Sequence, residues 1–202
     1  MKIFSKILRA AFLFLFLCAL SCATGEDRLS IHYTPPEKAP LVIPENEKFV
    51  LYLAPVEGDA SVLWYTLGKH KWVLEKAPTL IVHEAVTTEL ERMGISVTDD
   101  PGESQARLKV EIRWFAPWGH AKVTACMILS LALSTDEGVE PLWRDKIEAG
   151  TFLETPAWQA RGKAHYFEKV ASEALSKTVR QIGWNSDFSL ALREIQKREK
   201  LE

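Results

Sequence analysis

Cysteine is scarce in this sequence. Only three cysteines occur among the 202 residues, and two of them, Cys18 and Cys22, lie near the N-terminus. If the chain is cut before Cys22, Cys126 is the only other cysteine that remains, which excludes a framework of internal disulfides. Cys126 falls inside a predicted strand, where a lone cysteine usually serves as a small hydrophobic residue of the core.

Basic clusters and membrane-spanning runs are also lacking. The sequence has 25 Lys and Arg residues against 27 Asp and Glu residues, and it contains no dense block of Lys or Arg. Because binding to a polyanion needs a concentrated basic face, a nucleic acid is not expected as a partner. The apolar run from Ala10 to Leu20 is shorter than the roughly 20 residues that a helix needs to cross a bilayer.

Patterns typical of metal centres and enzymes are missing too. The segment "HEAVT" at His83–Thr87 resembles a zinc-protease helix, but Thr87 occupies the position of the second histidine. No serine lies in a nucleophile elbow, and no glycine-rich phosphate loop occurs. We therefore expect no metal, no cofactor and no enzymatic activity. The remaining histidines stand singly, at His32, His70, His120 and His165.

The N-terminal segment indicates export. Three basic residues precede the short apolar run, a pattern typical of a secretory signal. The stretch Ala19-Leu20-Ser21-Cys22 resembles the lipobox of bacterial lipoproteins, in which the cysteine thiolate takes up a diacylglyceryl group. The resemblance implies a lipid on Cys22 and, because Ala23 follows rather than Asp, an outer-membrane location facing the periplasm. The alternative is an ordinary signal peptide, or an uncleaved anchor, with two incidental cysteines.

These features divide the chain into four parts. Residues 1–21 form the predicted signal peptide, and residues 22–47, which contain four prolines, form a semi-extended tether. At roughly 3 Å per residue, this tether could hold a domain tens of ångströms from the membrane. Residues 48–184 form an α/β domain, and residues 185–202 form a short helix with a charged tail that frays.

Hydrophobic periodicity predicts the elements of the domain. Phe49–Val56 is apolar on both faces, as in a buried strand, and a helix follows Pro78, a residue favoured at the first helical position. On this helix Glu84, Glu89 and Glu91 are expected to face solvent. The remaining predicted elements are a strand at 95–98, a meander with strands at 106–114, 121–133 and 141–152 and turns at Ala116–Gly119 and Asp136–Gly138, and a helix at 163–182 that Gly183 ends.

The pattern of the meander defines the expected fold class. Alternate residues of its first strand are apolar, which predicts one buried and one solvated face. Both helices need an apolar sheet face to cover their own stripes. We expect an α+β two-layer sandwich, in which a mixed sheet with the order β-α-β-β-β-α carries two helices on one face. The residues predicted to be buried in the first meander strand are Ala106, Leu108, Val110, Ile112 and Trp114.

Several segments resemble the YajG group of bacterial lipoproteins. They are "TLIVHEAVTTELERMGISV", "ARLKVEIRWF", "ACMILSLALSTDEGVEPLWRDKIEAGTF" and "GWNSDFSLALRE", in this order after Cys22. The chain is also similar, more loosely, to auxiliary lipoproteins of envelope ABC transporters. The resemblance covers most of the mature chain and implies a lipid-anchored domain without catalytic residues.

Aromatic residues are the candidates for a binding surface. The segment "VLWYTLGKHKWVL" places Trp64, Tyr65 and Trp72 in a predicted hairpin, and Trp118 lies in another predicted turn. The rings either cover one end of the core or form an exposed patch for a protein partner or a lipid. We expect a protein-interaction module in envelope assembly or maintenance. The alternative is an auxiliary lipid-binding lipoprotein of an envelope ABC transporter.

Overall fold

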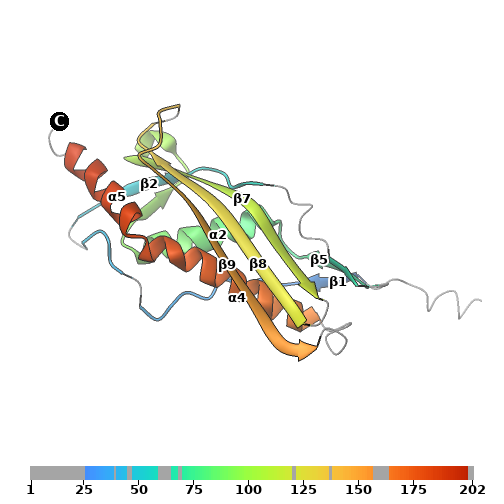
Figure 1. Cartoon of the computed structure of the whole chain (residues 1–202). Coiled ribbons are helices and arrows are strands. Elements are labelled where there is room, and N and C mark those ends of the chain that lie inside the picture. Colours follow the sequence, from blue (N-terminus) through green and yellow to red (C-terminus); the bar gives the residue numbers. More distant parts are fainter. Residues whose placement is uncertain are drawn as a thin grey trace, which may run out of the picture.

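The computed structural model shows an α+β domain, which confirms the expected fold class. A mixed six-stranded sheet forms one layer, and helices pack against it (Figure 1). A third helix contacts the sheet in addition to the two that were expected. The structure describes residues 26–38, 40–44, 47–58, 65–67, 70–119, 122–136, 138–156 and 164–199.

The sheet combines parallel and antiparallel strands in the order β6-β2-β7-β8-β9. Strand β2 lies between β6 and β7 and is parallel to both. It therefore has the interior place in the sheet that its apolar sequence predicted. Strands β7, β8 and β9 form the predicted antiparallel meander, and β3 pairs with β7. The strands are β2 (Val50–Leu53), β3 (Glu57–Gly58), β6 (Ser96–Thr98), β7 (Ala106–Gly119), β8 (Lys122–Ser134) and β9 (Trp143–Pro156).

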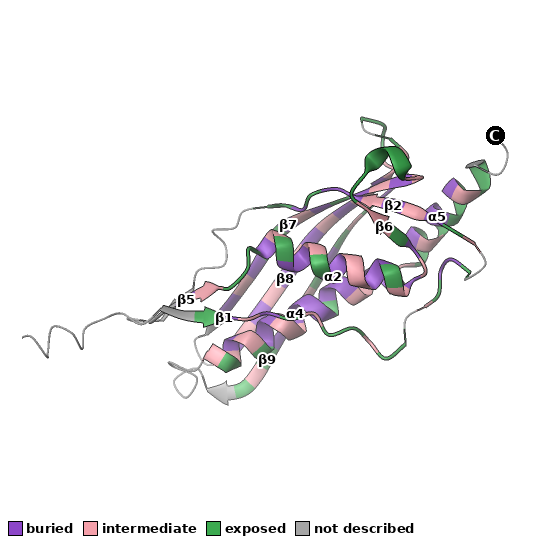
Figure 2. Cartoon of the chain, turned by 180° about the vertical axis from the view of Figure 1, so that it is seen from behind, coloured by how far each residue is buried: buried purple, intermediate pink, exposed green. Residues whose placement is uncertain are grey.

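The core lies between the meander and helices α2 (Pro78–Arg92) and α4 (Ala164–Trp184). Every second residue of β8 from Val123 to Leu133 is at most 3% exposed, which confirms the predicted buried face. Figure 2 shows the two helices side by side over this face of the sheet. The apolar stripe predicted for the long helix is buried as well, and it comprises Phe167, Val170, Ala171, Ala174, Leu175, Val179 and Ile182.

The turn from α2 into β6 depends on a glycine. Gly94 follows the helix with a φ of 85°, a left-handed conformation that glycine adopts without strain. A Cβ atom at this position would lie 2.6 Å from the carbonyl oxygen of Ile43. The amides of Val42 and Ile43 both donate to the carbonyl of Met93, so this part of the predicted tether packs against the turn.

A second sheet of three strands lies at one end of the molecule. Strands β4 (Tyr65–Leu67) and β5 (His70–Leu74) are antiparallel, which confirms the predicted hairpin. Strand β1 (Glu26–Leu29) pairs in parallel with β5, a contact that the sequence pattern did not predict. From Glu26 to Leu29, the segment expected to be a tether is therefore a strand of the folded domain.

The segment after β1, residues 30–36, forms a strap along α4. The strap is extended, as its prolines predicted, but its alternate amides donate to side chains four residues apart on the helix. The two spacings match because two residues of an extended chain and four residues of an α-helix both span about 6 Å. The strap therefore does not project into solvent. The three hydrogen bonds run from Ser30 N to Glu168 Oε1 (2.9 Å), from His32 N to Ser172 Oγ (3.1 Å) and from Thr34 N to Ser176 Oγ (2.9 Å).

The C-terminal segment is longer and better packed than expected. Helix α5 (Ser186–Glu199) continues almost directly from α4, and it buries Phe188 and Leu192 completely. Phe188 packs against Trp143 of β9 in a tilted arrangement, with ring centroids 4.9 Å apart. These contacts fix the first half of the helix to the sheet, and the charged end that was expected to fray from Arg193 is helical as far as Glu199.

Candidate functional site

The face of the sheet that turns away from α2 and α4 is open in the described part of the chain (Figure 1). The strand register places the side chains of this face in rows across β7, β8 and β9. One half of the open face is charged, and the other half is apolar. From the charged to the apolar half, the rows are Lys109–Ala132–Arg144, Glu111–Ser130–Lys146, Trp114–Ile128–Glu148 and Ala116–Cys126–Gly150.

A β-bulge in β7 creates the apolar half. The register between β7 and β8 shifts between Ile112 and Trp114, which inserts one residue and exchanges the two faces of the strand. Trp114 is therefore 44% exposed, although its alternation predicted a buried residue, and Phe115 is buried in its place. The sequence gives no glycine or proline signal for this bulge.

The predicted turn in this region is also wrong. Strand β7 continues through Ala116–Gly119, which was expected to form a turn. Pro117 fits in the strand because, over these residues, β7 pairs with β8 alone among the described strands. The longer strand extends the open face toward the end of the molecule that carries β1 and β5.

Four side chains form a continuous apolar strip on the open face: Trp114, Ala116, Cys126 and Ile128. We call this surface the apolar strip. Its three smaller members are half-buried. Cys126 is paired with Gly150 on β9, which has no side chain that could cover this edge of the strip. Cys126 thus lies on the open face, and its predicted place in the core is wrong. An exposed aromatic ring beside small apolar side chains is typical of a contact surface.

The charged half of the open face is already largely neutralised. Arg113 binds Glu111 at 2.7 Å, and Lys109 binds Glu57 at 2.9 Å. An open hollow of about 520 Å³ lies above these residues, with Arg144 and Lys146 on its far side. Exposed ion pairs of this kind contribute little to stability, and they remain available to a charged partner.

Cys126 supplies a natural reporter of the apolar strip. Burial raises the pKa of its thiol, and the nearby carboxylate of Glu148 raises it further. Since the thiolate is the reactive form, we expect iodoacetamide to alkylate Cys126 of the folded mature protein more slowly than a free cysteine at neutral pH. The rate should rise with pH beyond the ordinary thiol pKa of about 8.5. Equal rates for the folded and the urea-unfolded chain would contradict this prediction.

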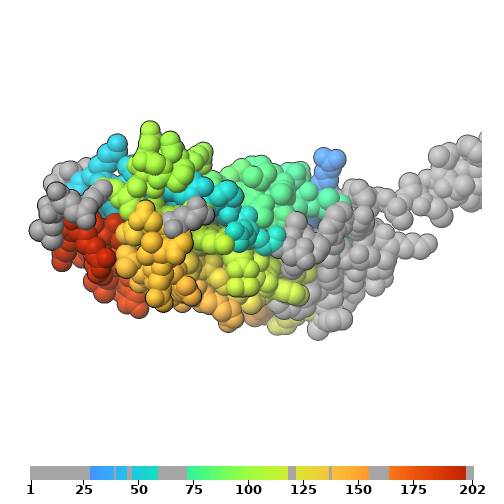
Figure 3. Space-filling view, turned by 90° about the horizontal axis from the view of Figure 1, so that it is seen from above, coloured from blue at the N-terminus to red at the C-terminus, as the bar shows by residue number. Residues whose placement is uncertain are grey.

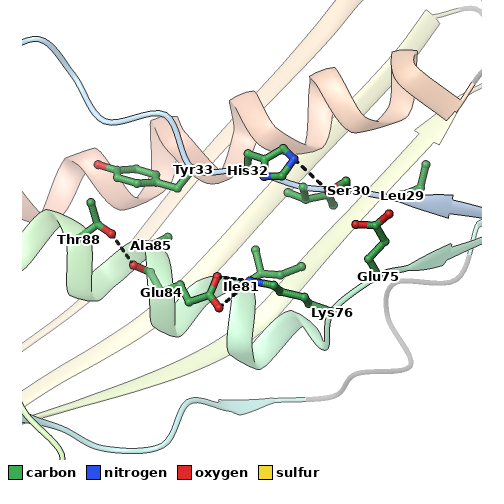
Figure 4. Close-up of a pocket in the computed structure, with 11 residues that line it drawn as sticks. Leu29, Ser30, His32, Tyr33, Glu75, Lys76, Ile81, Glu84, Ala85 and Thr88 are labelled. Atoms are coloured by element: carbon green, nitrogen blue, oxygen red, sulfur yellow. Dashed lines mark hydrogen bonds and ion pairs between the residues drawn. The ribbon is translucent and has the colours of Figure 1, made fainter.

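A polar pocket of about 250 Å³ lies on the other side of the molecule, between the strap and α2 (Figure 4). Lys76 Nζ binds both carboxylate oxygens of Glu84 at 2.7 and 2.8 Å. Ser30 Oγ and His32 Nε2 lie 3.0 Å apart, but no described carboxylate orients the imidazole as a catalytic triad requires. Lys76 and Glu84 therefore neutralise each other within this pocket.

Of the aromatic residues predicted to bind a partner, Tyr65 and Trp72 are paired across β4 and β5, and only the side chain of Trp72 lies in the described part. Trp72 is 0% exposed and stacks on Phe167, with ring centroids 4.6 Å apart. Its ring therefore belongs to the core, and Trp72 is not available to a partner. Trp64 and the lipidation candidate Cys22 lie outside the described residues. Tyr65 lies in β4 and Trp118 pairs with Thr124, but the side chains of both also lie outside the described part.

Within the described residues, no group of three or more His, Cys, Asp and Glu side chains could hold a metal ion. None of the described helices is both long and apolar enough to cross a membrane.

Comparison with known proteins shows the fold but no sequence family. No protein-family model and no curated protein sequence matches the chain. The crystal structure of XCC0632 from Xanthomonas campestris, a DUF330 protein, is 15% identical with a TM-score of 0.57 and covers 86% of this chain and 99% of its own. The crystal structure of a homolog of the neuraminyllactose-binding hemagglutinin from Helicobacter pylori is 16% identical with a TM-score of 0.50. It covers 84% of this chain and 100% of its own.

A minor lipoprotein from Acinetobacter baumannii also matches, at 13% identity and a TM-score of 0.39, and covers 67% of this chain and 93% of its own. The first two likenesses, at 15% and 16% identity, show a shared fold alone. They agree with the architecture that the resemblance to YajG-like lipoproteins implies, and the family itself stays a prediction.

Proposed function

We propose that the protein is a lipid-anchored, non-enzymatic module of the bacterial envelope that binds a protein partner through the apolar strip. The lipobox-like sequence at Cys22 supports the anchor and the outer-membrane location facing the periplasm. The YajG-like resemblance supports a role in envelope assembly or maintenance. The observation that carries the proposal is an open sheet face on which a bulge turns Trp114 outward.

The composition of this face favours a protein over a lipid. Trp and Arg are enriched at the centres of protein interfaces, and here Trp114 and Arg113 are adjacent on β7. The alternative, an auxiliary lipid-binding lipoprotein, would need a long apolar cleft for an acyl chain. The apolar strip is instead a surface of the sheet, and the large hollow beside it is lined mainly by charged residues.

Site-specific crosslinking in cells tests this proposal. A photo-crosslinking amino acid placed at the exposed Glu148, in the same row as Trp114 and Ile128, is expected to capture a protein. Trp114→Glu should then reduce the crosslink by about thirty-fold, because a tryptophan at the centre of an interface contributes roughly 2 kcal/mol or more. Leu190→Glu on α5 is the matched control, since Leu190 is also exposed, and it should leave the crosslink unchanged.

The crosslinked product also separates the two functions. A protein band that persists in Trp114→Glu would remove the apolar strip from the interface. A product that contains lipid and no protein would overturn the proposal in favour of the lipid-binding alternative.

A further inference from the structure

Strand β9 forms one edge of the six-stranded sheet. Among the described strands it pairs with β8 alone, and Figure 1 shows it as the outermost strand of the meander. An edge strand carries a row of amides and carbonyls without a strand partner, and proteins usually keep such strands short or cover them. Strand β9 is instead 14 residues long. What covers its outer row decides whether the edge is open to a further strand.

Side chains cover part of this outer row. The amide of Lys146 donates to Asp145 Oδ1 at 2.7 Å, and Gln181 Nε2 of α4 donates to the carbonyl of Glu148 at 2.8 Å. These two bonds show that Lys146 and Glu148 direct their backbone groups away from β8. Because the direction alternates along an antiparallel strand, every second residue after Glu148 also faces outward. The register with β8 is unbroken here, so the alternation continues through the second half of β9.

The two halves of β9 differ in protection. In the first half, Phe188 of α5 packs against Trp143, and Figure 3 shows α5, in red, beside the start of β9, in yellow-orange. In the second half, no described residue bonds to the outward amides and carbonyls of Gly150 and Phe152. Gly150 is exposed, and Phe152 is 54% exposed. The open part of the edge is therefore residues 148–154.

A second copy of the chain fits this open edge. Two identical strands related by a two-fold axis are antiparallel, so a second β9 extends the sheet when the axis passes beside Gly150. Glu148 then lies opposite Phe152 of the second copy, and Gly150 lies opposite its own equivalent. No side chain separates the strands at the axis, and the backbone hydrogen bonds between these residues use no amide that is already occupied.

Charge complementarity selects this register. Lys146 lies opposite Glu154 of the second copy, and the axis repeats the pair. Moving the axis one residue toward Glu154 would place Glu148 opposite Glu154, and like charges directly opposite are destabilising. Moving it the other way would need the occupied amide of Lys146. Within one copy, Lys146 already lies 3.5 Å from Glu148, and Glu154 lies 2.9 Å from Lys122, so the new pairs set the register more than the affinity.

We propose that the protein forms a two-fold dimer in which the second halves of two β9 strands pair and join two sheets into one. This inference goes beyond the proposed function and rests neither on the anchor nor on the apolar strip. Because the axis is perpendicular to the sheet, both open faces look the same way. The row Ala116–Cys126–Gly150 continues into the same row of the second copy, so the two apolar strips flank the paired glycines.

Thiol crosslinking tests the pairing. Gly150→Cys in a Cys126→Ser background places two thiols across the axis, and a short bismaleimide added to cells that express the full-length protein should join them. The side chain fits, because the nearest group to a Cβ atom at Gly150 is the carbonyl oxygen of Ala125, 3.6 Å away. We expect a product of twice the chain mass. Ser96→Cys, exposed on β6 at the other edge of the sheet, is the matched control and should give no such product, as should the background variant alone.

Charge variants separate pairing from misfolding. Lys146→Glu places like charges opposite each other and should reduce the crosslinked product roughly ten-fold. Combining it with Glu154→Lys restores opposite charges and should recover the product. Lys109→Glu makes the same change at an exposed lysine of β7, away from the edge, and should have no effect.

Sedimentation equilibrium of the purified protein in detergent measures the same association without a crosslinker. Gly150→Pro removes an outward amide and leaves the bonds to β8 in place, so it should weaken the dimer by roughly ten-fold or more. A parent protein that sediments as a monomer, or a crosslink at position 150 no stronger than at position 96, would overturn the inference and leave the proposed function standing. A Glu148 crosslink between two copies should be lost in Gly150→Pro, whereas capture of a different protein should be lost in Trp114→Glu, so the two proposals fail separately.

Discussion

Replacing Trp72 with alanine is expected to lower the free energy of unfolding by about 3–5 kcal/mol, the range for deleting a large aromatic ring from a packed core. The ring is fully buried and stacks on Phe167 of α4, so it joins the small sheet to the long helix. The loss would be a large part of the 5–15 kcal/mol that typically stabilises a domain. Guanidinium unfolding, followed by far-UV circular dichroism, measures it.

Trp114→Ala is the matched control for this result. The same residue type is exposed on the apolar strip, so its truncation leaves no cavity, and we expect a change within about 0.5 kcal/mol. If both variants lost the same free energy of unfolding, the burial of Trp72 would not explain its contribution to stability. The pair also separates a structural role from a binding role, because only Trp114 should matter for the crosslinked partner.

Elements with regular periodicity could be predicted from the sequence. The stripes of α2 and α4 and the alternation in β8 each repeat over several turns or residue pairs, and the buried positions followed them. The bulge could not be predicted in this way. Its sequence alternates without interruption through Trp114, and only the pairing with β8 shows where an extra residue is inserted.

The positions of Glu89 and Gly183 were predicted wrongly, although both residues fit the helical spacing of the buried stripes. Glu89 was expected to face solvent, but it is 0% exposed, and it follows Val82 and Ala85 at helical spacing within the buried stripe. Gly183, expected to end the long helix, lies inside α4. A Cβ atom at Gly183 would lie 2.7 Å from Glu89 Oε1, so the glycine provides room for the buried carboxylate.

The strap had a weaker signal of the same kind. Polar residues recur every four positions on α4, at Glu168, Ser172, Ser176 and Arg180, and each of them binds the strap. A row of this type is also typical of a solvated helix face. Which interpretation holds depends on a segment more than 130 residues away in the sequence, and a local pattern does not contain that information.

The strap is also fastened to α2 by a hydrogen bond to a buried carboxylate. The hydroxyl of Tyr33 donates to Glu89 Oε2 at 2.5 Å, and the guanidinium of Arg92 lies 3.7 Å from the same oxygen. Arg92 also donates to the carbonyl of Pro36 at the end of the strap. Since Glu89 Oε1 has no hydrogen-bond partner among the described groups, the carboxylate depends on Tyr33 and Arg92.

Tyr33→Phe is therefore expected to cost about 1.5–3 kcal/mol, the range for a hydrogen bond to a charged group, because it removes the donor and leaves the carboxylate buried. Tyr52→Phe is the control, since the Tyr52 hydroxyl has no described hydrogen-bond partner, and its free energy of unfolding should stay nearly unchanged. A loss that is equal in both variants would remove the buried hydrogen bond as the explanation.

The pH dependence of the free energy of unfolding distinguishes the loss of this hydrogen bond from a packing defect, because a packing defect would not depend on pH. Burial raises the pKa of Tyr33 above the ordinary value of about 10, and the hydrogen bond and charge of Glu89 raise it further. Because the unfolded chain releases the phenol proton first, this contribution is complete below about pH 10 and declines at higher pH. The difference in stability between the parent protein and Tyr33→Phe should therefore be constant from about pH 8 to about pH 10 and smaller at about pH 11. A difference that stays constant as far as about pH 11 would mean that the ring, and not the proton shared with Glu89, secures the strap.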